Sequence, residues 1–274
     1  MPIPPDFQFS QSSLQDFADC PRRFELRYIL RQNWPAVRSE PVLEMENWME
    51  QGKLFHQLVH QYLLGIPENL LRSLITQPEG LQWWEQFLKL NPLAGLPQEI
   101  RLPEYRLTAP FHGFRLVAQY DLLCLSAGNR AVIVDWKTSR HRAKYGWRER
   151  LQTRVYLYLL VSAGARLNNN QAWQPEQLEM LYWFPAFPHE PEKIAYSTAK
   201  YTADHEFLTS LVSQILSTPN GGFAKTNDEK QCRFCPYRSL CERGERAGNF
   251  AEDEDDQATG LINLDLDEIE ELEF

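Results

Sequence analysis

Several features of other protein classes are missing from this chain of 274 residues. No apolar run approaches the roughly 18 residues that a membrane-spanning helix needs. The first residues lack the charged and apolar regions of a secretory signal. Neither an internal repeat nor the P-loop pattern Gly-x-x-x-x-Gly-Lys-Ser/Thr occurs. These absences argue against a membrane protein and against P-loop nucleotide hydrolysis, and we expect a soluble, cytoplasmic protein.

Basic residues are absent from one end of the chain. Residues 247–274 contain no Lys or Arg but hold eleven of the 37 acidic residues, which leaves 26 acidic against 28 basic residues in 1–246. The net charge of −9 therefore comes from the tail, and the body is slightly basic. An acidic total does not exclude a surface for an anionic polymer when the acid lies in a tail. We expect a folded domain over 1–246 and a disordered acidic tail over 247–274.

Apolar periodicity divides the body into helices and strands. Helical spacing covers about 12–30, 43–64, 81–90, 147–163 and 201–216. A capping box of Ser12 and Gln15 opens the first helix. Strand-like stretches cover 100–107, 114–125, 131–136, 178–184 and 193–197. The third is nearly all apolar, which indicates a strand covered on both faces. The pattern predicts an α/β fold with a central sheet flanked by helices.

Two aspartates and a lysine follow short apolar runs in the middle of the chain. Asp121 follows Val117–Tyr120, Asp135 follows Ala131–Val134, and Lys137 lies two residues after Asp135. Neighbouring strands lie about 5 Å apart, so both carboxylates could reach one hard divalent cation. Lys137 points to the same face as Asp135 and could orient water or neutralise charge. A surface ion pair at a strand end is the other interpretation.

Three further polar residues lie on predicted helices. His56 could be a metal ligand or an ordinary helical histidine. Gln152 and Tyr156 are four residues apart and share one helix face, just after the Asp135 strand. Both could hydrogen-bond a phosphate or Lys137, or could simply be polar residues in an apolar helix.

The five cysteines form a separate signal. Cys232, Cys235 and Cys241 are closely spaced, and Cys20 lies far away near the start. Such spacing in a cytoplasmic protein favours metal over disulfides. Four thiolates suit zinc or an iron–sulfur cluster. Cys124 lies within an apolar run and is expected in the core.

These motifs together resemble the PD-(D/E)XK nuclease superfamily, in its RecB-like and AddB-like branch with a four-cysteine iron–sulfur cluster, which includes CRISPR-associated exonucleases. The resemblance covers most of residues 10–241. One departure is Ala118, where the family often has glycine. Glu104 resembles an acidic residue that some members carry on the preceding strand. The matching residues, in chain order, are Ser10, Ser12, Leu14, Phe17, Cys20, Pro21, Phe24, Gly52, His56, Asp121, Asp135, Trp136, Lys137, Gln152, Tyr156, Cys232, Cys235 and Cys241.

The resemblance implies a restriction-endonuclease-like core that hydrolyses phosphodiester bonds. His56, Asp121, Asp135 and the Trp136 carbonyl would bind Mg²⁺ or Mn²⁺. Lys137 would position the attacking water, and Gln152 and Tyr156 would steady Lys137 and the DNA backbone.

The resemblance also implies a structural [4Fe-4S] cluster on the four cysteines, with zinc as the less favoured occupant. It would staple the N-terminal helical segment to the C-terminal cysteine segment across a loop of roughly 210 residues.

Basic residues near Lys137 suggest where DNA would bind. The candidate contacts are Arg140, Arg142, Lys144, Arg148 and Arg154. Interleaved aromatic residues could stack on bases, so we favour single-stranded or frayed DNA ends. A solvated basic loop is the other interpretation. The predicted activity is an exonuclease of repair, recombination or CRISPR adaptation. The alternative is a non-catalytic iron–sulfur module that binds DNA beside a partner helicase or nuclease.

The acidic tail has three open interpretations. It could be a solvated terminus, a peptide that docks a protein partner, or an internal mimic of DNA that covers the basic groove. Its alternating acidic and apolar residues from Leu261 to Phe274 are typical of a segment that folds on contact.

Overall fold

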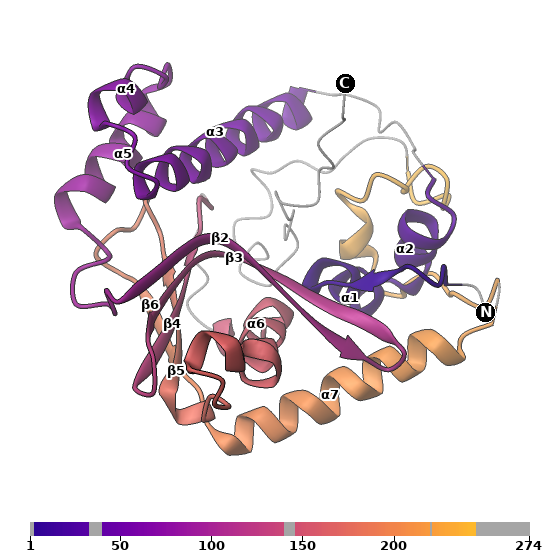
Figure 1. Ribbon diagram of the computed structural model, residues 1–274. Helices are drawn as coiled ribbons and strands as arrows, with labels where there is room; N and C mark the ends of the chain where they lie inside the picture. The colour runs from indigo at the N-terminus through magenta and orange to yellow at the C-terminus, as the bar shows by residue number, and fades with distance from the viewer. Residues whose placement is uncertain (1–2, 33–39, 140–145, 220, 245–274) are drawn as a thin grey trace.

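The computed structural model describes residues 3–32, 40–139, 146–219 and 221–244. A six-stranded mixed sheet forms its centre, in the order β1-β3-β4-β5-β6, with β2 also paired to β3. β1 lies parallel to β3 and β4 parallel to β5, while the other pairs are antiparallel (Figure 1). The strands are β1 (Gln8–Phe9), β2 (Ile100–Phe111), β3 (Phe114–Ser126), β4 (Arg130–Trp136), β5 (Leu178–Trp183) and β6 (Glu192–Ala195).

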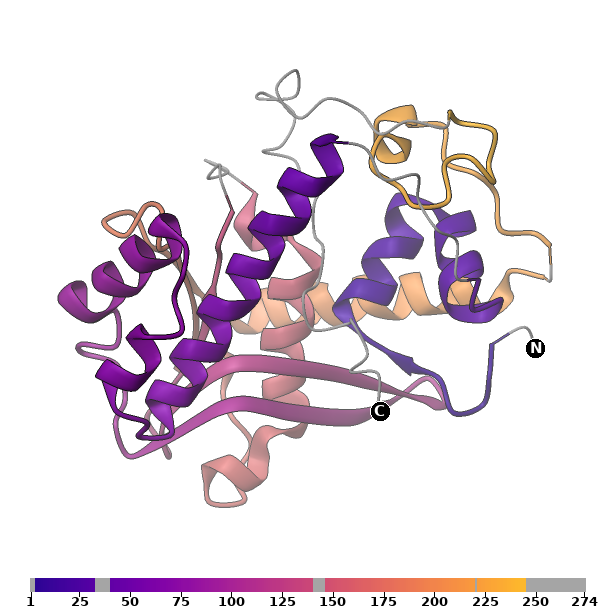
Figure 2. The ribbon, with the colours of Figure 1, turned by 90° about the horizontal axis from the view of Figure 1, so that it is seen from above.

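Helices cover the sheet, as the sequence predicted. Helices α1, α6 and α7 lie toward one face, and α3, α4 and α5 form a separate group on the other (Figures 1 and 2). The α-helices are α1 (Gln11–Asp19), α2 (Pro21–Phe24), α3 (Glu40–Leu63), α4 (Glu68–Arg72), α5 (Pro78–Leu90), α6 (Leu151–Ala163) and α7 (Thr198–Ser217). A π-helical turn, Glu25–Ile29, continues α2.

Strand β4 separates two hydrophobic cores. Ile133 packs into the core on the α6 side, while Val132 and Val134 pack into the core beneath α3 and α5. All three are fully buried. The prediction of a strand covered on both faces is therefore confirmed, and it explains why this stretch is apolar without alternation.

The first helix differs from its prediction. Helix α1 starts at Gln11, and its capping box joins Ser10 to Ser13 rather than Ser12 to Gln15. It stops before Cys20, whose backbone is extended (φ −159°, ψ 102°). The reason is Pro21, because a residue before proline is sterically disfavoured in the helical region. The apolar periodicity continues through this break and therefore suggested one longer helix.

The long β2–β3 hairpin kinks at one place. In a regular strand, every second residue faces the same side. Along β3, Ala118 and Tyr120 face the α6-side core, but so does Leu123, which lies three residues after Tyr120. The regular alternation is therefore interrupted between residues 120 and 123. The pairing register with β2 skips Glu104 and Asp121 at the same level. Glu104 has a left-handed backbone (φ +48°), which is uncommon for a non-glycine residue. Asp121 therefore lies at a local distortion, a feature often found beside active sites.

One edge of β3 is partly open. Strand β2 pairs along the whole of one edge. Strands β1 and β4 must therefore share the other edge, where they pair with Arg115–Leu116 and with Leu122–Ser126. Within the described ranges, no strand pairs with the stretch 117–121 on that edge. A gap in the sheet thus leads up to Asp121.

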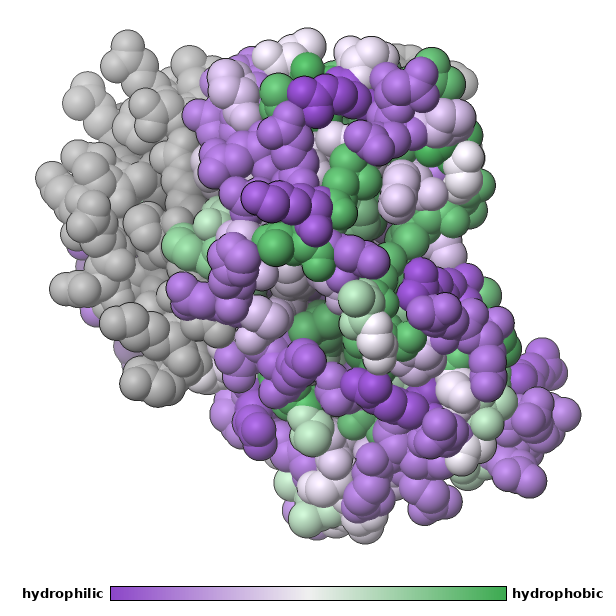
Figure 3. Space-filling view, turned by 90° about the vertical axis from the view of Figure 1, so that its left-hand side faces the viewer, coloured by the Kyte–Doolittle hydropathy of each residue, from purple (hydrophilic) through white to green (hydrophobic). Residues whose placement is uncertain are grey.

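The surface around α4 and α5 is partly apolar. Viewed from that side, hydrophobic side chains appear among hydrophilic ones (Figure 3). Leu64, Leu70 and Leu74 each expose more than half of their surface.

No helix in the described part of the chain combines the length and hydropathy needed to cross a membrane. The acidic tail lies outside the described residues, so its three interpretations stay predictions.

A buried ion pair ties α6 to α7. Asp204 on α7 accepts hydrogen bonds from the Arg154 guanidinium (2.9 Å) and the Tyr196 hydroxyl (3.0 Å). The Asp204 side chain is only 1% exposed. Arg154 also pairs with Glu149, which is exposed. The structure thus gives Arg154, predicted to contact DNA, a role in helix packing.

We predict that Asp204→Ala destabilises the fold strongly. The change leaves the Arg154 charge and the Tyr196 hydroxyl without their buried acceptor, at a cost of about 3 kcal/mol or more. Glu149→Ala, which removes the exposed partner of the same arginine, should cost less than about 1 kcal/mol. Urea unfolding measures both, and equal losses would contradict the packing role assigned to Asp204.

Candidate active site

The two predicted carboxylates meet beside β4. Asp135 lies near the end of β4, as predicted. Asp121, however, lies inside β3 and not at a strand end, because β3 continues to Ser126 in its pairing with β4. The pair Leu122–Val134 sets the register that brings Asp121 next to Asp135. Both are nearly fully buried, at 4% and 2% exposure.

Asp121 is held by groups that favour its charge. Its Oδ2 accepts the backbone N–H of Trp136 at 2.7 Å and lies 3.5 Å from Nδ1 of His56 on α3. Burial acts to raise the pKa of Asp121, but His56, the Trp136 N–H and Lys137 outweigh it and hold the pKa below its usual value. Asp121 is therefore the more readily ionised carboxylate of the pair.

For Asp135, in contrast to Asp121, burial outweighs the groups that favour the charged form. Its Oδ1 lies 2.8 Å from the Lys137 ammonium, and its Oδ2 accepts a hydrogen bond from Gln152 of α6 at 2.6 Å. Burial raises the pKa of Asp135 to about 6; Asp121 adds to this shift and Lys137 opposes it. The structure therefore brings together the Asp135–Lys137 pair and three residues that the sequence analysis assigned to other elements, namely His56, Asp121 and Gln152.

Two other charged residues belong to this neighbourhood. Glu104 accepts a hydrogen bond from Gln119 at 3.0 Å, and burial and the charge of Asp121 raise its pKa. Arg150 stacks on the Trp147 ring at 3.6 Å. Burial lowers the pKa of Arg150, and the nearby Tyr182 and Asp135 oppose that change. Charge and spacing alone do not distinguish Arg150 from the other arginines of its segment.

The other predicted contacts fall in different places. Tyr156 is buried, and its backbone carbonyl accepts the Tyr120 hydroxyl at 3.1 Å; it lines a cavity beside β3. Arg148 is exposed on a short turn after the basic loop. Arg140, Arg142 and Lys144 lie outside the described residues. Trp136 buries its ring against Phe87 and Trp183, so any metal contact would come from its backbone.

The donor types at this site suit a hard divalent cation. Two buried carboxylates and an imidazole lie together, and carboxylate oxygens are the ligands that such a cation prefers. As the side chains stand, however, the described residues contain no group of three or more His, Cys, Asp or Glu side chains that could hold a metal ion. To bind a metal ion, Oδ1 of Asp135 would have to exchange its contact with the Lys137 ammonium for a contact with the ion.

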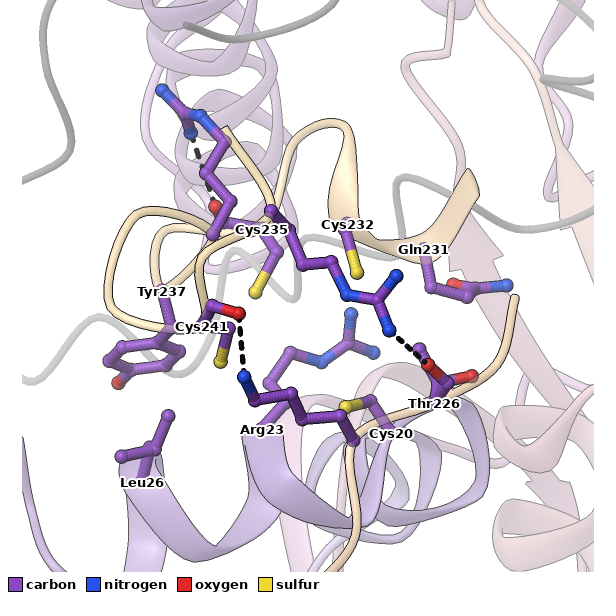
Figure 4. Close-up of a pocket in the computed structure, with 12 residues that line it drawn as sticks. Cys20, Arg23, Leu26, Thr226, Gln231, Cys232, Cys235, Tyr237 and Cys241 are labelled. Atoms are coloured by element: carbon purple, nitrogen blue, oxygen red, sulfur yellow. Dashed lines mark hydrogen bonds between the residues drawn. The ribbon is translucent and has the colours of Figure 1, made fainter. Parts of the chain in front are cut away.

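The four distant cysteines form a second cluster. Cys20 follows α1, while Cys232, Cys235 and Cys241 lie in the C-terminal segment beside α2 (Figures 1 and 2). Their sulfur atoms surround one small cavity (Figure 4). The N–H of Arg22 also donates to the carbonyl of Ala224 at 3.0 Å. The predicted approach of the two chain segments is confirmed.

The four thiols lie close enough to affect one another's ionisation. Burial raises the pKa of Cys235 to about 11, and Cys20 and Cys232 add to the shift. Four neighbouring thiols are donors of the kind that bind zinc or an iron–sulfur cluster. Cys124 is fully buried in the core, apart from the other four.

The chain is similar to known proteins in sequence and in structure. Residues 8–242 match the PD-(D/E)XK nuclease superfamily. A candidate exonuclease from Eubacterium rectale is similar in structure, with 13% identity, a TM-score of 0.51, and coverage of 82% of this chain and 85% of that one. The crystal structure of SSO0001 is similar at 12% identity and a TM-score of 0.40, over 85% of each chain. No curated protein matches the sequence.

We predict that Mn²⁺ affinity rises with pH and levels off above about pH 6. Below the raised pKa of Asp135 the metal must displace a proton, so affinity should rise up to roughly tenfold per pH unit. Calorimetric titration on both sides of pH 6 measures this dependence. Asp135→Asn should weaken binding and make the pH dependence less steep, leaving the part that comes from His56. Glu179→Gln, which alters the partner of Arg130 at the far end of β4, should change neither. A flat wild-type profile would contradict the assignment.

Proposed function

The chain belongs to the PD-(D/E)XK nuclease superfamily, and from that premise we propose that it is a metal-dependent deoxyribonuclease acting on single-stranded or frayed DNA ends. Nucleases of this superfamily generally use Mg²⁺ or Mn²⁺. The observation that carries the proposal is the gathering of Asp121, Asp135 and Lys137 around one buried point. A surface ion pair does not account for two neighbouring carboxylates at 4% exposure or less.

Each residue has a proposed role. His56, Asp121, Asp135 and the Trp136 carbonyl hold the cation, which supplies charge stabilisation at the phosphate. Lys137 orients the attacking water and offsets charge on the phosphate oxygens. Gln152 donates a hydrogen bond to Oδ2 of Asp135 and thereby orients the carboxylate so that Oδ1 faces Lys137. Arg150, stacked on Trp147, adds a positive charge close to Asp135.

We further propose that the four cysteines bind a structural metal centre. The resemblance to the RecB-like and AddB-like branch favours a [4Fe-4S] cluster, with zinc as the less favoured occupant. In either case the centre would join Cys20 at the end of α1 to the C-terminal segment, next to Arg23 and Lys225. These cations offset the negative charge of a four-thiolate site. Its distance in the sequence from the carboxylates suits a structural role.

A non-catalytic DNA-binding module is the alternative. It would keep the fold and the metal centre but would not need Lys137 directed at Asp135. Any unwinding of duplex ends would come from a partner, since the chain has no P-loop pattern. Repair, recombination and CRISPR adaptation all use such an activity.

We predict that Lys137→Ala lowers the rate of DNA cleavage in Mn²⁺ by at least about 100-fold, because water orientation and charge stabilisation are lost. Labelled single-stranded and duplex DNA serve as substrates. Lys193→Ala, which removes an exposed lysine on β6, should cleave like the wild type. Equal cleavage by Lys137→Ala and the wild type would overturn the mechanism, and no cleavage by either would favour the binding module.

For the cysteine centre, anaerobic purification should give a brown protein with iron and sulfide. Cys232→Ser and Cys235→Ser should lose the metal and unfold at lower temperature. Cys124→Ala, which alters only the core, should retain the metal in full. Stoichiometric zinc without iron would refute the cluster but keep the centre, and protein free of both metals would refute the centre itself.

A further inference from the structure

A cavity of about 390 Å³ lies in the gap along the open edge of β3. Its floor is the backbone stretch 117–119, and its walls come from the β1–α1 junction, from α6 and from β2. The volume lies within the range of small-molecule sites, about 300–1,000 Å³. The residues that carry the inference are Gln8, Arg31, Arg106, Gln119 and Tyr156.

The cavity adjoins the candidate active site through two elements. Gln119 lies two residues before Asp121, which corresponds to about 7 Å along a strand. Tyr156 lies one helical turn from Gln152, or about 6 Å along α6. A chain that enters the cavity is therefore next to Asp121 and Asp135 without any movement of the sheet.

The lining has the chemistry of a nucleotide site. Arg106 is directed by a hydrogen bond from its Nη2 to the Gln8 side-chain oxygen (2.8 Å), which leaves its other N–H groups for a ligand. Arg31 lines the same cavity, and two guanidinium groups suit phosphate oxygens. Phe7 and Val117, which are half-buried, supply apolar surface for a base or sugar. The acidic side chain in the lining is Asp6.

The start of α1 adds to this environment. Its N-cap, Ser10, lines the cavity, so the positive end of the nine-residue helix lies at the wall. A space of about 390 Å³ is large enough for one nucleotide. An unpaired strand can turn a single nucleotide into such a space, whereas a paired base in a duplex is held in its stack.

We propose that this cavity binds the nucleotide of an unpaired DNA strand that adjoins the scissile phosphate, with Arg31 and Arg106 on its phosphate and Phe7 and Val117 beside its base. The inference rests on the proposed nuclease function and deepens it. It makes single-strand preference a property of the gap between β1 and β4, rather than of the basic loop alone.

The test is binding of fluorescein-labelled oligothymidylate in EDTA, followed by anisotropy over a series of salt concentrations. Arg106→Ala should weaken binding about tenfold and reduce the salt slope by roughly 0.7, the value for one lost phosphate contact on a single strand. Gln8→Ala should have a smaller effect in the same direction, because Arg106 loses its anchor. Arg130→Ala, at the far end of β4, is the matched control and should bind normally.

Kinetics with Mn²⁺ give a second readout. Arg106→Ala should raise KM with little change in kcat, since the residue contributes to binding and not to chemistry. Arg106→Lys should recover part of the affinity. Unchanged oligothymidylate binding by Arg106→Ala, or an equal loss for blunt duplex, would overturn the cavity assignment. Neither result would affect the nuclease proposal, which depends on the Lys137→Ala comparison.

Discussion

The burial of two carboxylates side by side is the constraint on which the rest of the site depends. Asp121 and Asp135 are almost excluded from water, so each needs compensating partners. Asp121 obtains them from Trp136 and His56, while Asp135 obtains them from Lys137 and Gln152. These partners come from β4, α3 and α6, and so the site exists only when both layers of helices are packed on the sheet.

Local signals in the sequence were sufficient for most elements. The apolar stretch of β4 and the alternation of β2 and β3 predicted those strands because each pattern reflects burial on one or two faces. The gathering of His56, Gln152 and the two aspartates was predicted from the order of motifs, since spacing alone leaves each of them ambiguous. The N-terminal helix was misjudged because Pro21 breaks it without interrupting its apolar periodicity.

Other features depend on the tertiary structure and leave no local pattern. The kink at Glu104 and Asp121 arises where β3 changes which residues face inward, and alternation in the sequence cannot locate it. The open edge of β3 exists because β1 and β4 pair with separate stretches of the same strand. Arg106 and Arg154 make their hydrogen bonds with Gln8 and Asp204, which are distant in the sequence. For such residues, charge alone did not distinguish a surface ligand contact from a buried structural pair.

The central claim is that Asp121 and Asp135 together hold a divalent cation at the phosphate. Anomalous diffraction at the manganese edge, from crystals grown with Mn²⁺ and a non-hydrolysable single-stranded DNA, tests it most directly. We expect one anomalous peak between the two carboxylates and His56, in contact with a phosphate oxygen. Bound DNA with no manganese at that position, or manganese only elsewhere, would contradict the account.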